Sequence, residues 1–185
     1  MRKSRITKMI LCAMFAAITA VLSQIAIPIG PIPINLATFA VFCAGALLGP
    51  RLGALSMTVW VALGAVGVPV FTMLSGGFAI LTGPTGGFII GYIPAAFLVG
   101  LIIDKANSRK IYVYPIAMIA GAVIYFTLGT VWFMVVMITG PVQALMACVV
   151  PFLIGDAVKI VAATSLCFAL RPIVYAKPVS PAKTS

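Results

Sequence analysis

Two charged residues interrupt an otherwise apolar stretch, residues 142–170. A charged side chain at the centre of a bilayer costs at least ~2.5–3.5 kcal/mol on insertion scales, so such residues usually serve a function. Asp156 and Lys159 are spaced i, i+3, which puts both on one face of a helix. A mutually neutralising pair that only locks the helix is the alternative, but apolar residues would do this at lower cost. We interpret the pair as a ligand site, in which Lys159 would meet a carboxylate and Asp156 would meet N–H donors.

A glycine-rich stretch, residues 75–87, is the second candidate for ligand contact. Its five glycines lack Cβ atoms, so their backbone can approach a ligand closely. A flexible extracellular turn is the alternative, but such turns are usually polar, and this region keeps several large apolar residues. We therefore expect a lid folded over a cavity. The ligand-contacting residues expected here are Phe78, Gly83, Pro84, Thr85, Gly86 and Gly87, with Tyr92 just beyond them.

Most enzyme chemistry is excluded by the residue inventory. The chain has no His and two acidic residues, Asp104 and Asp156, which lie far apart in the sequence. A Ser-His-Asp or Cys-His centre is therefore impossible, and no phosphate-binding G-x-x-x-x-G-K-[ST] loop occurs. The four cysteines are scattered without C-x-x-C spacing and lie in apolar runs. We expect no catalytic residues, no metal and no cofactor.

The elements that must position these residues are membrane helices. Of the 185 residues, 63% are hydrophobic and 8% are charged, and the mean hydropathy is +1.26. Soluble domains average roughly 45–50% apolar and about 25% charged residues. A length of 185 residues fits one domain, residues 1–185. The chain is predicted to be an all-α integral membrane protein with a single transmembrane substrate-binding domain.

Six apolar runs are predicted to form a bundle of transmembrane helices, since a bilayer core needs roughly 20 apolar residues for each span. Two of the runs are short, with Gly and Pro crowding their outer ends. Irregular backbone at membrane depth is tolerated where protein buries it or where it lines a cavity. We therefore expect a pocket in the outer half of the bundle. The predicted helices cover residues 9–29, 36–48, 52–70, 88–103, 111–138 and 142–170.

The basic residues predict the orientation of this bundle. Eleven of the twelve Lys and Arg residues lie in the two tails, at Arg51 or within residues 105–110, and Lys159 is the exception. The three intervening loops, near residues 28–35, 71–87 and 139–141, carry none. This split places both termini in the cytoplasm of a multi-pass protein of the cell membrane. It also argues against a nucleic-acid partner, because the charges flank helices.

The first helix carries two overlapping small-x-x-x-small spacings, a pattern that lets helices approach closely in lipid. An internal contact within the bundle and a contact with another protein are equally compatible with it. The residues are Ala13, Ala16, Ala17 and Ala20.

Four segments, in their order along the whole chain, resemble the BioY proteins, which are the biotin-specific substrate-binding (S) components of energy-coupling factor (ECF) vitamin transporters. They are PIPINLAT at 31–38, AGALLGPRLG at 44–53, GPTGGFIIGY at 83–92 and the Asp156/Lys159 pair. The resemblance implies a six-helix bundle that binds biotin near its extracellular face. It also implies three partner subunits: a transmembrane coupling protein, docked on the alanine face of the first helix, and two cytoplasmic ATPases that supply the energy.

Individual roles follow from the resemblance. Asp156 would accept hydrogen bonds from the ureido N–H groups of biotin, Lys159 would meet its valerate carboxylate, and residues 83–87 would line or cover its bicyclic ring. Many relatives read Pro-x-Pro-x-Thr-x-Gln after the first helix, whereas Asn35 and Ala37 stand at the last two named positions here. Asn35 or Thr38 would then replace the glutamine contact. An S component for another small vitamin, a self-sufficient permease and a structural adaptor are the alternatives.

Overall fold

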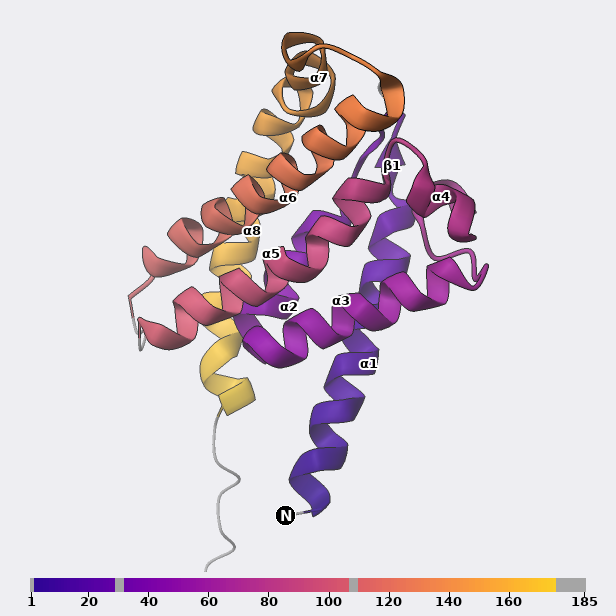
Figure 1. Ribbon diagram of the computed structural model, residues 1–185. Helices are drawn as coiled ribbons and strands as arrows, with labels where there is room; N and C mark the ends of the chain where they lie inside the picture. Colours follow the sequence, from indigo (N-terminus) through magenta and orange to yellow (C-terminus); the bar gives the residue numbers. More distant parts are fainter. Residues whose placement is uncertain (1, 29–31, 107–109, 176–185) are drawn as a thin grey trace, which may run out of the picture.

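The computed structural model describes residues 2–28, 32–106 and 110–175 (Figure 1). Some residues used in the sequence argument lie outside this part of the chain. They are Pro31 of the first motif and three basic residues, Arg109, Lys177 and Lys183.

Helices make up nearly the whole structure, as predicted. The long ones are α1 (Arg2–Gln24), α2 (Ala37–Leu48), α3 (Pro50–Ala65), α5 (Gly86–Lys105), α6 (Val113–Met137) and α8 (Val150–Tyr175). Shorter ones are the 3-10 helix η1 (Thr72–Leu74), α4 (Phe78–Thr82) and α7 (Pro141–Cys148). Between α1 and α2, the strands β1 (Ala26–Ile27) and β2 (Ile34–Asn35) form a small antiparallel hairpin with Ala26 opposite Asn35.

Four apolar segments of the described chain are long enough to cross a membrane: Ile6–Gln24, Gly86–Lys105, Val113–Met137 and Pro141–Pro172. The helices α2 and α3 have 12 and 16 residues. At 1.5 Å per residue they extend only about 18 and 24 Å, less than a full bilayer core. The chain is thus a membrane protein with several spans, and the count of six remains a prediction.

Several predicted helix boundaries were wrong, including the start of the first helix, which lies at Arg2 instead of residue 9. The apolar run 142–170 is divided at Val149 (φ −118°, ψ −55°) into α7 and α8. Pro151 explains the break, because it has no N–H to donate to the carbonyl four residues back and its ring clashes with that carbonyl. The first helix ends at Gln24 instead of residue 29, where the chain enters the hairpin. The third ends at Ala65 instead of residue 70, because Gly67 adopts φ +102°.

The centre of the bundle is α2. All but one of its residues are buried, and it packs against α1, α3, α5 and α8. A helix that is hydrophobic on every side suits such a position. Gly45 permits the close contact with α5, because a Cβ there would lie 2.5 Å from the carbonyl oxygen of Ala96. This packing fixes the start of α2 beside the middle of α8, where the candidate site lies.

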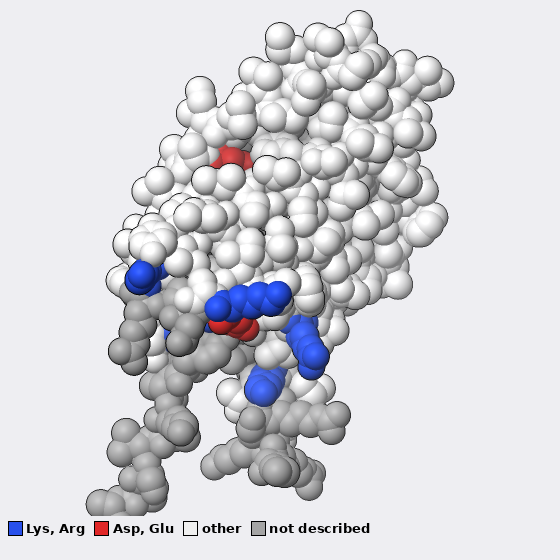
Figure 2. Space-filling view, turned by 60° about the vertical axis from the view of Figure 1, so that its left-hand side comes forward, with Lys and Arg blue, Asp and Glu red and all other residues white. Residues whose placement is uncertain are grey.

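Charge is concentrated at one end of the molecule. The start of α1 and the end of α8 lie at the lower end in Figure 1, whereas β1, α4 and α7 lie at the upper end. Lys and Arg side chains gather at the lower end in Figure 2. There, Arg171 of α8 pairs with Asp104 of α5 at 2.5 Å. This is the distribution that the predicted orientation, with the lower end in the cytoplasm, requires.

Candidate ligand-binding site

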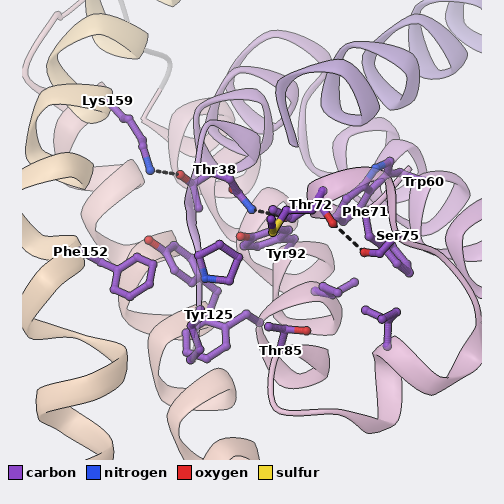
Figure 3. A pocket seen from close by; sticks show the side chains of 17 residues that line it. Thr38, Trp60, Phe71, Thr72, Ser75, Thr85, Tyr92, Tyr125, Phe152 and Lys159 are labelled. Atoms are coloured by element: carbon purple, nitrogen blue, oxygen red, sulfur yellow. Dashed lines mark hydrogen bonds between the residues drawn. The ribbon is translucent and has the colours of Figure 1, made fainter. Parts of the chain in front are cut away.

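A cavity of about 210 Å³ lies between the hairpin, the loop that follows α3, and helices α2, α3, α5, α6 and α8 (Figure 3). Its wall is largely aromatic and aliphatic, with a few polar groups, which is the usual make-up of a small-molecule site. The apolar wall includes Ile32, Trp60, Phe71, Ile80, Phe88, Ile89, Tyr92, Tyr125 and Phe152. The polar groups are Asn35, Thr38, Thr72, Ser75, Thr85 and Lys159.

Lys159 supplies the cavity with a buried positive charge. Its Nζ atom lies 3.0 Å from Oγ1 of Thr38 and 2.9 Å from Oδ1 of Asp156. The lysine side chain is 8% exposed and the aspartate side chain 5%. An ammonium group has three N–H donors, and these bonds use two of them. The third donor can serve an acceptor on a ligand.

Asp156 lies behind the lysine and does not line the cavity. Its Oδ1 accepts hydrogen bonds from Lys159 and, at 3.5 Å, from Thr38. Its Oδ2 accepts one from the hydroxyl of Tyr125 on α6. The aspartate therefore has partners at both oxygens, and it compensates the lysine charge. The ion pair required by the alternative interpretation is present, but one of its members also faces a cavity.

Stacked and edge-on rings form a continuous apolar wall. Trp60 stacks on Tyr92 with ring centroids 6.0 Å apart, and Tyr92 meets Tyr125 edge-on at 5.5 Å. Phe71 contacts Trp60 edge-on at 5.1 Å. Aromatic pairs at these separations are favourable beyond their buried area. The wall can hold the flat, apolar part of a ligand.

Five residues expected to bind a ligand do line the cavity: Asn35, Thr38, Thr85, Tyr92 and Lys159. Asn35 is also bonded to its surroundings, since its Nδ2 donates to Oγ1 of Thr72 at 2.7 Å and its Oδ1 accepts from the N–H of Ala37 at 3.0 Å. Of residues 75–87, the segment expected to fold over a cavity, Ser75, Ile80 and Thr85 line the wall.

Other expected residues lie away from the cavity wall. Phe78 is 68% exposed, and neither Pro84 nor the glycines line the cavity. The carbonyl oxygen of Gly83 accepts a hydrogen bond from Nε1 of Trp132 at 3.0 Å. A Cβ at Gly86 would lie 1.8 Å from the carbonyl oxygen of Leu81, and one at Gly87 would lie 2.3 Å from Cβ of Trp132. These glycines allow α4 and α6 to approach the start of α5.

Several wall residues were missed by the sequence argument, notably Trp60, Tyr125 and Phe152. Each was interpretable as packing or as an interfacial aromatic, and no local spacing connects them to Asp156. The available signal for Tyr125 was a tyrosine at the middle of an apolar run, where its hydroxyl must find a partner.

The alanines of α1 divide between two faces. Ala16 is buried at 3% exposure and Ala20 is half-buried, so this spacing serves internal packing. Ala13 and Ala17 are exposed. Of the two pairs, only Ala13 and Ala17 lie on a surface that another protein can reach.

A second cavity of about 260 Å³ lies between α1, α2 and α8. Its lining consists of aliphatic and aromatic side chains with one methionine and one cysteine. It offers no charged or strongly polar group to orient a polar ligand. The first cavity is therefore the candidate site.

Comparison with known proteins decides the family. The sequence profile of the BioY family matches residues 1–176. This chain belongs to the BioY family. The resemblance seen in its motifs is thereby confirmed. BioY relatives include the probable biotin transporter BioY of Pyrococcus horikoshii, 40% identical over 161 residues that cover 87% of this chain and 93% of the relative. The biotin transporter BioY of Thermotoga maritima is 35% identical over 166 residues, which cover 90% of this chain and 96% of the relative.

The fold agrees with the BioY assignment. The crystal structure at 2.1 Å of the S-component for biotin from an ECF-type ABC transporter superimposes with a TM-score of 0.87 and 28% identity. The match covers 92% of this chain and 94% of the other. The chain is thus a membrane transporter component of the S-component fold and not an enzyme, as expected from its sequence.

Proposed function

We propose that this chain is the biotin-binding S component of an ECF transporter and takes up biotin across the cytoplasmic membrane. The observation that carries the proposal is the buried ammonium of Lys159, which lines an aromatic cavity in a member of the BioY family. Biotin combines a carboxylate, an apolar chain and ring, and two ureido N–H groups. The cavity offers a cation, an apolar wall and several polar groups to match them.

We assign the carboxylate of biotin to Lys159, through a charge-assisted hydrogen bond. The rings of Trp60 and Tyr92 would cover its apolar bicyclic part. Figure 3 places Thr72 and Ser75 on the side of the cavity opposite Lys159, where they can meet the ureido group. Asp156 has its oxygens engaged by protein donors, so we propose that it holds the lysine in position. A direct bond from Asp156 to a ureido N–H would require one of those donors to move.

The hairpin and α4, which contribute residues to the cavity wall, lie at the end of the bundle opposite the basic residues (Figures 1 and 2), so biotin would enter from the extracellular side. The bundle would have six spans with both termini in the cytoplasm. Energy would come from partners, a transmembrane coupling protein and two cytoplasmic ATPases, because the chain carries no phosphate-binding loop. We propose the exposed Ala13 and Ala17 as part of the surface that meets the coupling protein.

Calorimetry on the detergent-solubilised chain tests this function directly. Biotin should bind with one site, and lipoate, which has a carboxylate but no ureido group, should bind far more weakly. Mass spectrometry of small molecules that co-purify with the protein gives an independent identification. A wild-type protein that binds no biotin, or that prefers another vitamin, would overturn the proposal.

A further inference from the structure

We infer that Gln24, at the end of α1, is a positioning residue that holds the loop 71–75 against the cavity so that Thr72 and Ser75 face the ligand. Gln24 itself does not line the cavity. This inference rests on the proposed function, and it adds a residue that governs how long the ligand is retained.

The side-chain amide of Gln24 bonds to two backbone groups of this loop. Its Oε1 accepts from the N–H of Leu74 at 2.7 Å, and its Nε2 donates to the carbonyl oxygen of Phe71 at 3.0 Å. Only one amide orientation satisfies both groups, because an N–H needs an acceptor and a carbonyl needs a donor. The half-buried glutamine therefore bridges the beginning and the apex of the loop.

The loop backbone is in an unusual conformation that requires such support. Met73 and Leu74 have φ values of 59° and 54°, in the left-handed region that residues with a side chain rarely occupy. Their side chains are 67% and 71% exposed, so burial does not hold them in place. Hydrogen bonds must therefore maintain this shape. At the apex, Gln24 contributes the bond that its Oε1 accepts from the N–H of Leu74.

Most other contacts fix the base of the loop, and at the apex the hydroxyl and the N–H of Ser75 donate to the carbonyl oxygen of Thr72, at 2.6 and 3.4 Å. Ser23 and Trp60 both donate to the carbonyl oxygen of Val70, at 2.7 and 3.0 Å. Asn35 donates to Oγ1 of Thr72. Within the loop, the N–H of Phe71 donates to the carbonyl oxygen of Ser75 at 2.9 Å. Loss of Gln24 should therefore loosen the apex while the bundle and the base of the loop persist.

The loop forms one wall of the cavity through Phe71, Thr72, Met73 and Ser75. A bound ligand can leave by this route only when the loop opens. More frequent opening raises the dissociation rate constant and leaves the association rate constant nearly unchanged, the usual pattern for related binding sites. Removing two hydrogen bonds corresponds to a rise in koff of about tenfold.

The test compares wild type with Gln24→Met, which keeps the length of the side chain. The variant removes both bonds to the loop, together with those that Nε2 makes within α1 to the carbonyl oxygen of Ala20 and the hydroxyl of Ser23. Ser165→Ala is the control, because the Ser165 hydroxyl makes only a bond of 3.1 Å to the carbonyl oxygen of Val161 on its own helix and is exposed. Hydrogen exchange followed by mass spectrometry measures how fast the backbone amides of the loop exchange. Stopped-flow binding of biotin gives kon and koff. Gln24→Met should exchange faster in peptides covering residues 71–75, with unchanged exchange in α2, and should raise koff about tenfold. The control should change neither.

Gln24→Glu keeps an acceptor for the Leu74 N–H but puts a carboxylate oxygen, which cannot donate, beside the carbonyl oxygen of Phe71, so its koff should also rise above that of wild type. It also carries the test if Gln24→Met does not fold. Faster exchange in the loop with unchanged koff would overturn the inference, and so would unchanged exchange. If wild type binds biotin and the Gln24 variants release it at the wild-type rate, only this inference fails. If wild type binds no biotin, the proposed function fails with it.

Discussion

Asp156 and Lys159 form a 2.9 Å ion pair inside the membrane part of the protein, and only the lysine reaches the cavity. The two residues thus have different surroundings although they share one face of α8. The aspartate compensates the charge of the lysine and is itself fixed by the hydroxyl of Tyr125. The lysine has a third N–H donor, which under the proposed function would meet the ligand. A buried pair of this kind adds little stability by itself, which favours a role in binding.

Lys159→Met should abolish high-affinity binding, with Kd raised roughly 100-fold or more, because the carboxylate of biotin loses its cation. The orientation of the ligand is tested with biotin methyl ester, which lacks the negative charge. If Lys159 meets the carboxylate, Lys159→Met should weaken the binding of biotin far more than the binding of the methyl ester. An equal loss for both ligands would place the ureido oxygen at the lysine instead.

Truncating one member of the pair should also destabilise the fold, by about 3–5 kcal/mol, since the other charge is left uncompensated. The double variant Asp156→Asn/Lys159→Met removes both charges and should recover most of this stability without recovering biotin binding. Thermal unfolding in detergent, with calorimetry on the same samples, separates the two effects. Recovery of binding in the double variant would contradict the role of Lys159.

Tyr125→Phe removes the hydroxyl that bonds to Asp156 but keeps the ring, which packs against Tyr92. We expect a loss of about 1–3 kcal/mol in the free energy of unfolding, the cost of a bond to a charged group. Affinity should fall modestly, because the lysine is then less firmly held. Tyr114→Phe on the same helix is a matched control, as Tyr114 is buried against Phe168 and away from the cavity.

The start of α5 allows a comparison between a residue that lines the cavity and a glycine that does not. Thr85→Val should weaken biotin binding with little effect on the melting temperature, since it removes a polar group from a residue that lines the cavity. Gly87→Ala should lower the melting temperature, because its Cβ would lie 2.3 Å from Trp132. Protein that folds at all should retain near-normal affinity. If Gly87→Ala is stable but binds biotin much more weakly, Gly87 contacts the ligand after all.

The alanines of α1 can be separated by substitution with leucine. Ala13→Leu and Ala17→Leu lie on the exposed face and should leave biotin binding intact while reducing co-purification with the coupling protein. Ala16→Leu lies in the core and should destabilise the isolated chain by about 1–3 kcal/mol through overpacking. Undiminished co-purification of the first two variants would assign the coupling surface to another face.

Local pattern in the sequence was sufficient for the membrane class, for the presence of the long helices but not for their ends, and for the gathering of basic residues at one end of the molecule. Hydropathy and the positions of Lys and Arg act over a few turns of helix, so they can be interpreted without knowing the fold. The i, i+3 spacing of Asp156 and Lys159 likewise fixes their common face, because it follows from helix geometry alone. The motifs were enough to place the chain in the BioY family, which the comparison confirmed.

Only the tertiary structure decided what those residues contact. Thr38 and Tyr125 are 118 and 31 positions from Asp156 in the sequence, and packing of α2 and α6 against α8 brings them to the carboxylate. Packing also decided that Ala16 turns inward, that the glycines before and within α5 serve helix contacts, and that Gln24 meets the loop 71–75. Such contacts depend on how whole helices cross, and no local spacing encodes the crossing.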